Sequence, residues 1–109
     1  MNHIVEKYFQ AFSTKDLNTL SELYADDVIL NEWNENKFEG KEAVLEANKK
    51  LFSLFNEIQI MVNASGEDTQ LPISLNEILV KLDDQFVRVI DVIQIVDEKI
   101  TYIMAYRGF

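Results

Sequence analysis

The stretch FVRVIDVIQIV, residues 86–96, contains a single acidic residue, Asp91. The β-branched and aromatic residues around it predict a strand, and successive side chains of a strand point to opposite faces. The residues that share a face with Asp91 are all branched and apolar: Val87, Val89, Ile93 and Ile95. The opposite face carries the polar side chains of Arg88 and Gln94. The acid therefore lies at the centre of the more hydrophobic face. An acid there has either a hydrogen-bond partner within the protein or a functional role.

Helical patterns come first in the chain and strand patterns follow. Apolar residues recur at helical spacing in 3–12 and in a segment that begins at Leu17, which Asp16 is suited to cap. The longest helical pattern is 40–55. Strands are expected at 28–33, 57–64, 70–82, 86–96 and 100–109. The order ααβαββββ predicts one α+β domain over residues 1–109, with a strongly curved, mostly antiparallel sheet wrapped around the long helix.

The segment at 70–82 changes its apolar phase halfway. Leu71, Ile73 and Leu75 are odd-numbered, whereas the later apolar residues Ile78 and Val80 are even-numbered. One extra residue in a strand produces such a change, so the pattern predicts a bulge between Leu75 and Ile78 that bends the sheet. A bent sheet around a helix encloses a space that can bind a ligand.

The composition limits the kinds of partner and environment that we expect for this chain. The net charge is −9, from 19 acidic against 10 basic residues, which argues against nucleic-acid binding because that needs basic phosphate contacts. No apolar run approaches the roughly 20 residues of a membrane span. The chain has no cysteine and its start does not resemble a secretory signal, so we expect a cytoplasmic protein without disulfides.

Three segments carry a resemblance to a known family. KYFQAFSTKDLNTLSELYADDVILNEW, then FEGKEAV, and the late pattern V-x-V-x-D-V-x-x-I-x-D-x-K-I resemble the NTF2-like superfamily, in particular its SnoaL-like and ketosteroid-isomerase-like branches. The resemblance covers nearly the whole chain. It implies a cone formed by a curved sheet and closing helices, with a pocket at the open end and sheet-to-sheet homodimers. It does not fix a reaction, because this fold carries many activities.

The ketosteroid isomerase pattern can be carried over residue by residue. Its helical tyrosine corresponds to Tyr8 in Y-F-Q-A-F-S-T-K-D-L, and its late-strand aspartic acid corresponds to Asp91. Its general base, an aspartate after the A-D-D turn, corresponds to Glu32. The sequence departs here twice, because glutamate replaces aspartate and Trp33 replaces the usual following proline. The resemblance thus implies Tyr8, Glu32 and Asp91 as catalytic residues.

These residue types suit proton transfer next to a carbonyl. A carboxylate removes a proton from carbon, while a phenol and a neutral carboxylic acid donate hydrogen bonds to the enolate oxygen. An acid among apolar side chains stays protonated more readily because burial disfavours its charge. The predicted ligand is a hydrophobic small molecule, and five further residues are expected to contact it: Phe12, Trp33, Phe55, Val89 and Arg107.

Each polar candidate also has a purely structural interpretation. Asp91 could pair with a buried tyrosine or a backbone group, and Tyr8 could belong to the core. Glu32 and Trp33 could lie on a solvated rim, and Arg107 could be an exposed residue at a strand end. Arg107 could also pair with Asp91 or Glu32 and hold either in its charged form.

Other chemistries fit less well. The only histidine is His3, and there is no glycine-rich phosphate loop, so we expect neither a metal nor a cofactor. Two functions remain: an isomerase or lyase that transfers protons, or a non-catalytic ligand-binding or dimerisation module. An open cavity of roughly 300 Å³ or more on which the three polar groups converge would favour the first, and a cone filled by Phe12, Phe52, Phe55 or Met104 the second. We also expect a homodimer through the sheet face that carries Arg88, Ile90, Val92 and Gln94.

Overall fold

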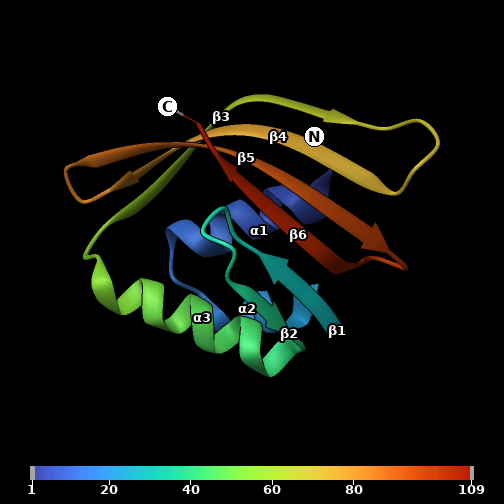
Figure 1. The fold of residues 1–109 in the computed structure, drawn as a ribbon, viewed down its shortest axis with the longest axis horizontal. Coiled ribbons are helices and arrows are strands. Elements are labelled where there is room, and N and C mark those ends of the chain that lie inside the picture. Colours follow the sequence, from blue (N-terminus) through green and yellow to red (C-terminus); the bar gives the residue numbers. More distant parts are fainter. Residues whose placement is uncertain (1, 109) are drawn as a thin grey trace.

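The computed structural model describes residues 2–108. Its three helices are α1 (His3–Ser13), α2 (Leu17–Leu23) and α3 (Lys41–Leu54). Its six strands are β1 (Tyr24–Asn31), β2 (Lys37–Glu39), β3 (Ile58–Glu67), β4 (Ile73–Leu82), β5 (Gln85–Val96) and β6 (Lys99–Arg107). The helices lie on one side of the curved sheet, and α3 runs beneath the sheet as its longest cover (Figure 1).

The first two helices begin at side-chain caps. The Asn2 side chain accepts a hydrogen bond from the Ile4 amide, 2.7 Å away, and so satisfies one of the free amides at the start of α1. Asp16 does the same for α2, accepting from the Thr19 amide and hydroxyl at 3.0 and 2.7 Å. α3 follows Gly40, whose φ of 91° suits glycine alone and lets its amide donate to the Val28 carbonyl of β1.

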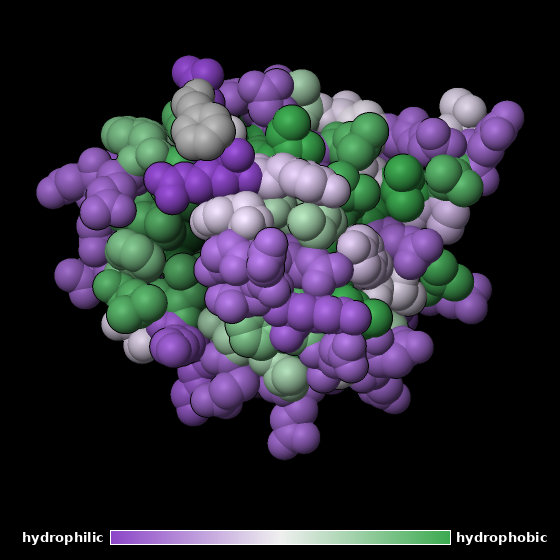
Figure 2. All heavy atoms as spheres, in the orientation of Figure 1, coloured by the Kyte–Doolittle hydropathy of each residue, from purple (hydrophilic) through white to green (hydrophobic). Residues whose placement is uncertain are grey.

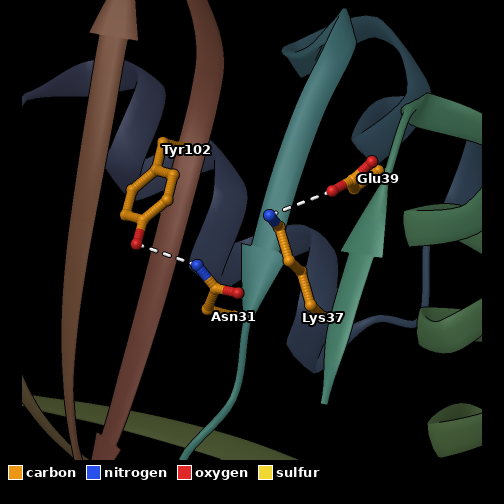
Figure 3. A network of polar contacts seen from close by, with 4 residues as sticks. All are labelled: Asn31, Lys37, Glu39 and Tyr102. Atoms are coloured by element: carbon orange, nitrogen blue, oxygen red, sulfur yellow. Dashed lines mark hydrogen bonds and ion pairs between the residues drawn. The ribbon is translucent and has the colours of Figure 1, made fainter. Parts of the chain in front are cut away.

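The six strands form one sheet in the order β2-β1-β6-β5-β4-β3. Only β1 and β6 run parallel, and every other neighbouring pair is antiparallel. Figure 3 shows two polar contacts beside this junction. The Asn31 amide donates to the Tyr102 hydroxyl at 2.9 Å and links β1 to β6, while Lys37 and Glu39 form a 2.9 Å ion pair along the edge strand β2.

The core lies between the concave face of the sheet and the three helices. Its fully buried members come from nearly every element: Val5, Leu20, Tyr24, Val28, Val44, Ile93, Ile100 and Ile103. The alternation of strands places Val89, Asp91 and Ile93 of β5 on this concave face. Because β5 and β6 are paired with Asp91 opposite Ala105, the concave residues of β6 are Ile103, Ala105 and Arg107.

The predicted fold is confirmed: the chain is α+β with a curved, mostly antiparallel sheet around the long helix. The strand β2 was not expected, because three residues are too few to produce an alternating pattern. The first strand also begins and ends earlier than predicted, at Tyr24 and Asn31. The ends of the predicted domain, residues 1 and 109, lie outside the described residues.

The predicted bulge between Leu75 and Ile78 is wrong. β4 pairs with β5 without interruption there, with Asn76 opposite Asp91 and Glu77 opposite Ile90. The irregularity lies across the ladder in β3, between Val62 and Ala64. The phase change in the sequence has another cause. Ser74 and Asn76 of β4 are buried polar residues on the concave face, while Leu75 is exposed on the convex face.

The convex face of the sheet carries the exposed apolar side chains of Leu75, Ile90 and Tyr106 beside the half-buried Val92 and Met104. Pairing places Ile90 beside Tyr106 and Val92 beside Met104, which gives two rows of apolar side chains across β5 and β6. Leu75 of β4 extends the second row, because it is paired with Val92.

Within residues 2–108, no helix is both long and apolar enough to cross a membrane.

Candidate functional site

A cavity of about 540 Å³ lies between the concave face of the sheet and the helices α1 and α3. This volume falls within the range of small-molecule sites, roughly 300–1,000 Å³. Most of its wall is apolar, including Leu30, Leu51, Ile60 and Ile78. Figure 2 shows hydrophobic surface gathered around a hollow on the left of the view, above the C-terminal half of α3, where the cavity opens.

All eight residues that the sequence singled out line this cavity. They are Tyr8, Phe12, Glu32, Trp33, Phe55, Val89, Asp91 and Arg107. They come from α1, the end of β1, the loop after it, the end of α3, and the paired strands β5 and β6. The fold thus brings together residues that are separated by almost the entire chain. Their roles in binding or catalysis stay predictions.

Asp91 is the buried acid of the cavity wall. Its side chain comes from the centre of β5 and the residue is 7% exposed. Within residues 2–108 no hydrogen bond or ion pair reaches its carboxyl group, yet every fully buried side-chain oxygen or nitrogen there has a partner. The carboxyl must therefore touch the cavity. Burial raises its pKa from 3.8 to about 7, because the charged form is poorly solvated.

Tyr8 reaches the same region from α1. Burial raises the pKa of its hydroxyl well above the ordinary value, and the nearby Tyr24, Asp91 and Glu32 raise it further. The hydroxyl therefore stays protonated and can serve as a hydrogen-bond donor. Behind it, the Tyr24 hydroxyl donates to the Asn48 side-chain oxygen at 2.6 Å. The ring centres of Tyr8 and Tyr24 lie 6.3 Å apart. The hydrogen-bonded Tyr24 and Asn48 therefore pack behind Tyr8 and support its position.

Glu32 follows β1 directly and is half-buried at the cavity wall. Its backbone is fixed by the turn into β2, since the Glu32 amide donates to the Asn36 carbonyl at 2.9 Å and the Glu35 amide donates to the Glu32 carbonyl at 3.1 Å. The carboxylate is close enough to Tyr8 to influence its pKa. The cavity thus holds two carboxyl groups in different surroundings, one buried in the centre of the sheet and one on the rim.

The rim also carries Trp33 and Arg107. The guanidinium carbon of Arg107 lies 6.0 Å from the centre of the Trp33 ring, and Trp33 is 44% exposed. Arg107 makes no ion pair with Asp91 or Glu32 among the described residues. The possibility that Arg107 holds Asp91 in its charged form is therefore absent from this structure, and desolvation alone sets the direction of the Asp91 pKa.

The aromatic side chains line the cavity without filling it. Phe12 packs edge-on against Phe52 of α3 with ring centres 5.2 Å apart, and against Tyr8 at 5.1 Å. Phe55 and Val89 face the space from the end of α3 and from β5. Met104, which could have filled the cone, lies instead on the row of the convex face. The open cavity is the arrangement that favours a ligand.

The sequence interpretation missed the partners of the site. Tyr24 and Asn48 fall at the buried positions of the two later helical patterns and were not singled out, whereas the structure places Tyr24 at the start of β1 and pairs it with Asn48 behind Tyr8. The available signal was Asn48 itself, a polar residue on the buried stripe of α3 that needs a hydrogen-bond partner. Within residues 2–108 no group of three or more His, Asp or Glu side chains is arranged to hold a metal ion.

Comparison with known proteins gives a family match over most of the chain. The model of the SnoaL-like domain family matches residues 5–103. No curated protein matches the sequence. Solved structures match only in fold, because their identities are low.

Three of these structures illustrate the range of the fold. A Kribbella flavida protein provisionally named a ketosteroid isomerase has a TM-score of 0.85 at 16% identity, covering 98% of this chain and 76% of its own. A Sinorhizobium meliloti protein provisionally named a polyketide cyclase scores 0.81 at 20% identity, covering 97% and 95%. An LEH-like epoxide hydrolase from M. tuberculosis scores 0.80 at 17% identity, covering 97% and 80%.

Proposed function

We propose that this chain, which belongs to the SnoaL-like domain family, binds an apolar carbonyl compound in its cavity and transfers a proton at the carbon next to the carbonyl. The family fold is shared by proteins named for isomerase, cyclase and epoxide hydrolase activities. The proposal for this chain rests on its own residues. One observation carries it: the unpaired Asp91 carboxyl faces an open apolar cavity that Tyr8 and Glu32 also line.

The three polar residues take different roles. The Glu32 carboxylate accepts a proton from the carbon next to the carbonyl, which leaves an enolate. The Tyr8 hydroxyl and the protonated Asp91 carboxyl donate hydrogen bonds to the enolate oxygen, where negative charge develops. Glu32 then returns the proton to a different carbon, so that a double bond has moved and no atom is gained or lost. The apolar wall excludes water, which strengthens both hydrogen bonds.

Solvent-exchange NMR tests the proposal. The protein is incubated in D2O with β,γ-unsaturated apolar ketones, and deuterium incorporation and double-bond migration are followed. We expect both with the unaltered protein. Glu32→Gln should lower the rate by about 100-fold or more, because general-base catalysis contributes that much.

Glu35→Gln is the matched control, since it removes the same charge from an exposed residue of the adjacent turn. Its rate should be unchanged. Ketone binding without any exchange above the buffer rate would overturn the catalytic role and leave a ligand-binding protein. Equal rates for Glu32→Gln and Glu35→Gln would exclude Glu32 as the base.

The apolar rows on the convex face, of which Leu75, Ile90 and Tyr106 are exposed, favour a second role, dimerisation. Leu75, Val92 and Met104 form one row and Ile90 and Tyr106 the next, and apolar patches of this kind mark interfaces. We propose a homodimer through this face, acting in the cytoplasm. Light scattering should give twice the chain mass, and Ile90→Asp should give a monomer. A monomer of the unaltered protein at high micromolar concentration would overturn the dimer.

A further inference from the structure

Arg107 is the cation on the sheet side of the cavity mouth. It is the last residue of β6, and it lines the cavity on the same face as Ile103 and Ala105. The chain has only two arginines, and the other, Arg88, lies on the convex face of β5. A strongly acidic chain thus presents a guanidinium at the entrance to its apolar cavity.

This guanidinium has no acidic partner in the described part of the chain. The ion pairs there join lysines to acids: Lys37 to Glu39, Lys41 to Asp26, and Lys81 to Glu57. Arg107 packs instead against Trp33, which limits the conformations of its side chain while leaving its N–H donors available. A planar guanidinium with free donors matches the two oxygens of a carboxylate.

The strand register gives the backbone separation between Arg107 and Asp91 along the sheet. Asp91 is paired with Ala105, and Arg107 lies two residues further along β6 toward the mouth. Two residues of a strand span about 7 Å. The wall along this path is apolar, with Val87 and Val89 on β5. One ligand of modest length can therefore contact both ends.

We propose that the ligand is an apolar carboxylic acid bound as its anion, with the carboxylate held by Arg107 at the mouth and the carbonyl directed to Asp91 and Tyr8. The inference rests on the proposed function for the location of the carbonyl, and otherwise only on the cavity. It defines the substrate class as a hydrophobic oxo acid. A single guanidinium fork fits a singly charged carboxylate, and the net charge of −9 disfavours more highly charged anions.

The test compares a carboxylic acid with its own neutral ester. The probes are 4-phenylbutyrate and methyl 4-phenylbutyrate, and the readout is the fluorescence of Trp33, the only tryptophan of the chain, which contacts Arg107. We expect the acid to bind about tenfold or more tightly than the ester in 50 mM NaCl, as a charge-assisted bidentate contact does. The preference should shrink in 500 mM NaCl because salt screens the contact.

Variants locate the preference. Arg107→Gln should reduce it to about twofold without weakening the ester, and Arg107→Lys should give an intermediate value because the charge remains without the fork. Lys49→Gln is the control and should keep the preference, since it removes one positive charge from an exposed residue of α3 outside the cavity lining. Thermal unfolding of each variant verifies the fold.

Each of the following outcomes either overturns or supports the proposed carboxylate binding. Equal affinity for the acid and the ester in the unaltered protein would overturn this inference and leave the proposed cavity function standing. Retention of the full preference in Arg107→Gln would overturn the assignment to Arg107. Failure of both probes to bind at millimolar concentration would overturn the inference together with the proposed ligand binding. Acid preference without proton exchange on ketones would support the inference and reject only the catalytic proposal.

Discussion

Asn76 and Asp91 are neighbours across β4 and β5, and their buried side chains differ in their hydrogen bonding. Both are buried polar residues on the concave face, 0% and 7% exposed, and they are directly paired in the sheet. The Asn76 side chain accepts a hydrogen bond from Ser65 at 2.7 Å and donates to Ser74 and to the Asp91 carbonyl at 3.0 and 3.4 Å. The Asp91 carboxyl has no such partner among residues 2–108 and faces the cavity.

The difference separates structure from function. A buried polar group whose hydrogen bonds are all made inside the protein stabilises the fold and has nothing left to offer a ligand. A buried carboxyl without partners destabilises the charged state and keeps its hydrogen-bonding capacity for whatever enters the cavity. Asn76 is thus a structural residue, and Asp91 is the residue on which the proposed function depends. Three predictions can break or sharpen this contrast.

The largest expected effect is the pH dependence of stability introduced by Asp91. The pKa of Asp91 in the folded state is about 7, above the ordinary value of 3.8. The carboxyl therefore stays protonated to a higher pH in the folded state than in the unfolded state. The contribution of Asp91 to stability is therefore fully present below pH 4, falls between pH 4 and 7, and is lost above pH 7. About three pKa units correspond to about 4 kcal/mol.

Asp91→Asn removes this effect, because an amide does not ionise. The free energy of unfolding, measured by urea denaturation at pH 4.5 and pH 8, should fall more steeply for the unaltered protein than for Asp91→Asn. Asp84→Asn, at an exposed residue, corrects for the change in net charge. Parallel pH profiles for Asp91→Asn and the unaltered protein would show that Asp91 ionises as easily as a surface acid.

A smaller, pH-independent loss is expected at Asn76. Asn76→Ala should leave the Ser65 and Ser74 hydroxyls without their partner, so stability should fall by about 2–3 kcal/mol at every pH. Urea denaturation at the same two pH values provides the measurement. A loss confined to high pH would mean that Asn76 acts through the Asp91 charge, which would erase the contrast between the two residues.

The smallest effect is expected at the second satisfied pair. Tyr24→Phe removes the 2.6 Å hydrogen bond to Asn48 and leaves a buried amide oxygen unpaired, so stability should fall by about 1–2 kcal/mol. Tyr102→Phe, which removes a partly exposed hydrogen bond to Asn31, is the control and should lose less. Thermal denaturation can rank the two. Equal losses would indicate that the Tyr24 and Asn48 pair has no special role beneath Tyr8.

The same contrast explains what the sequence could predict. Asp91 stood out because strand alternation gave it four apolar companions on one face, and the structure keeps it on that face. Asn76 did not stand out, since Ser74 and Asn76 are polar on a buried face and Leu75 is apolar on an exposed one. The pattern then suggested a bulge in β4, whereas the irregularity lies in the neighbouring strand β3. Whether such a polar residue is buried depends on its hydrogen-bond partners on other strands. The periodicity of one segment does not show those partners.

The arrangement at the rim also lay beyond the sequence. The position of Arg107 on the cavity face follows from alternation along β6, but its packing against Trp33 depends on the turn between β1 and β2. That turn leads into β2, a three-residue strand too short to show a pattern. The family resemblance supplied the cone and the three polar positions, and the open volume emerged only from the packing of α1 and α3 against the sheet.

A carboxyl carbon NMR titration of Asp91 tests the central claim most directly, with the signal assigned by its loss in Asp91→Asn. An unpaired carboxyl in an apolar cavity wall should titrate with a pKa of about 7. Such a value would leave it substantially protonated near neutral pH and able to donate a hydrogen bond to a ligand. A pKa at or below about 4, the unperturbed value for aspartate, would contradict the account, because a charged Asp91 could only accept.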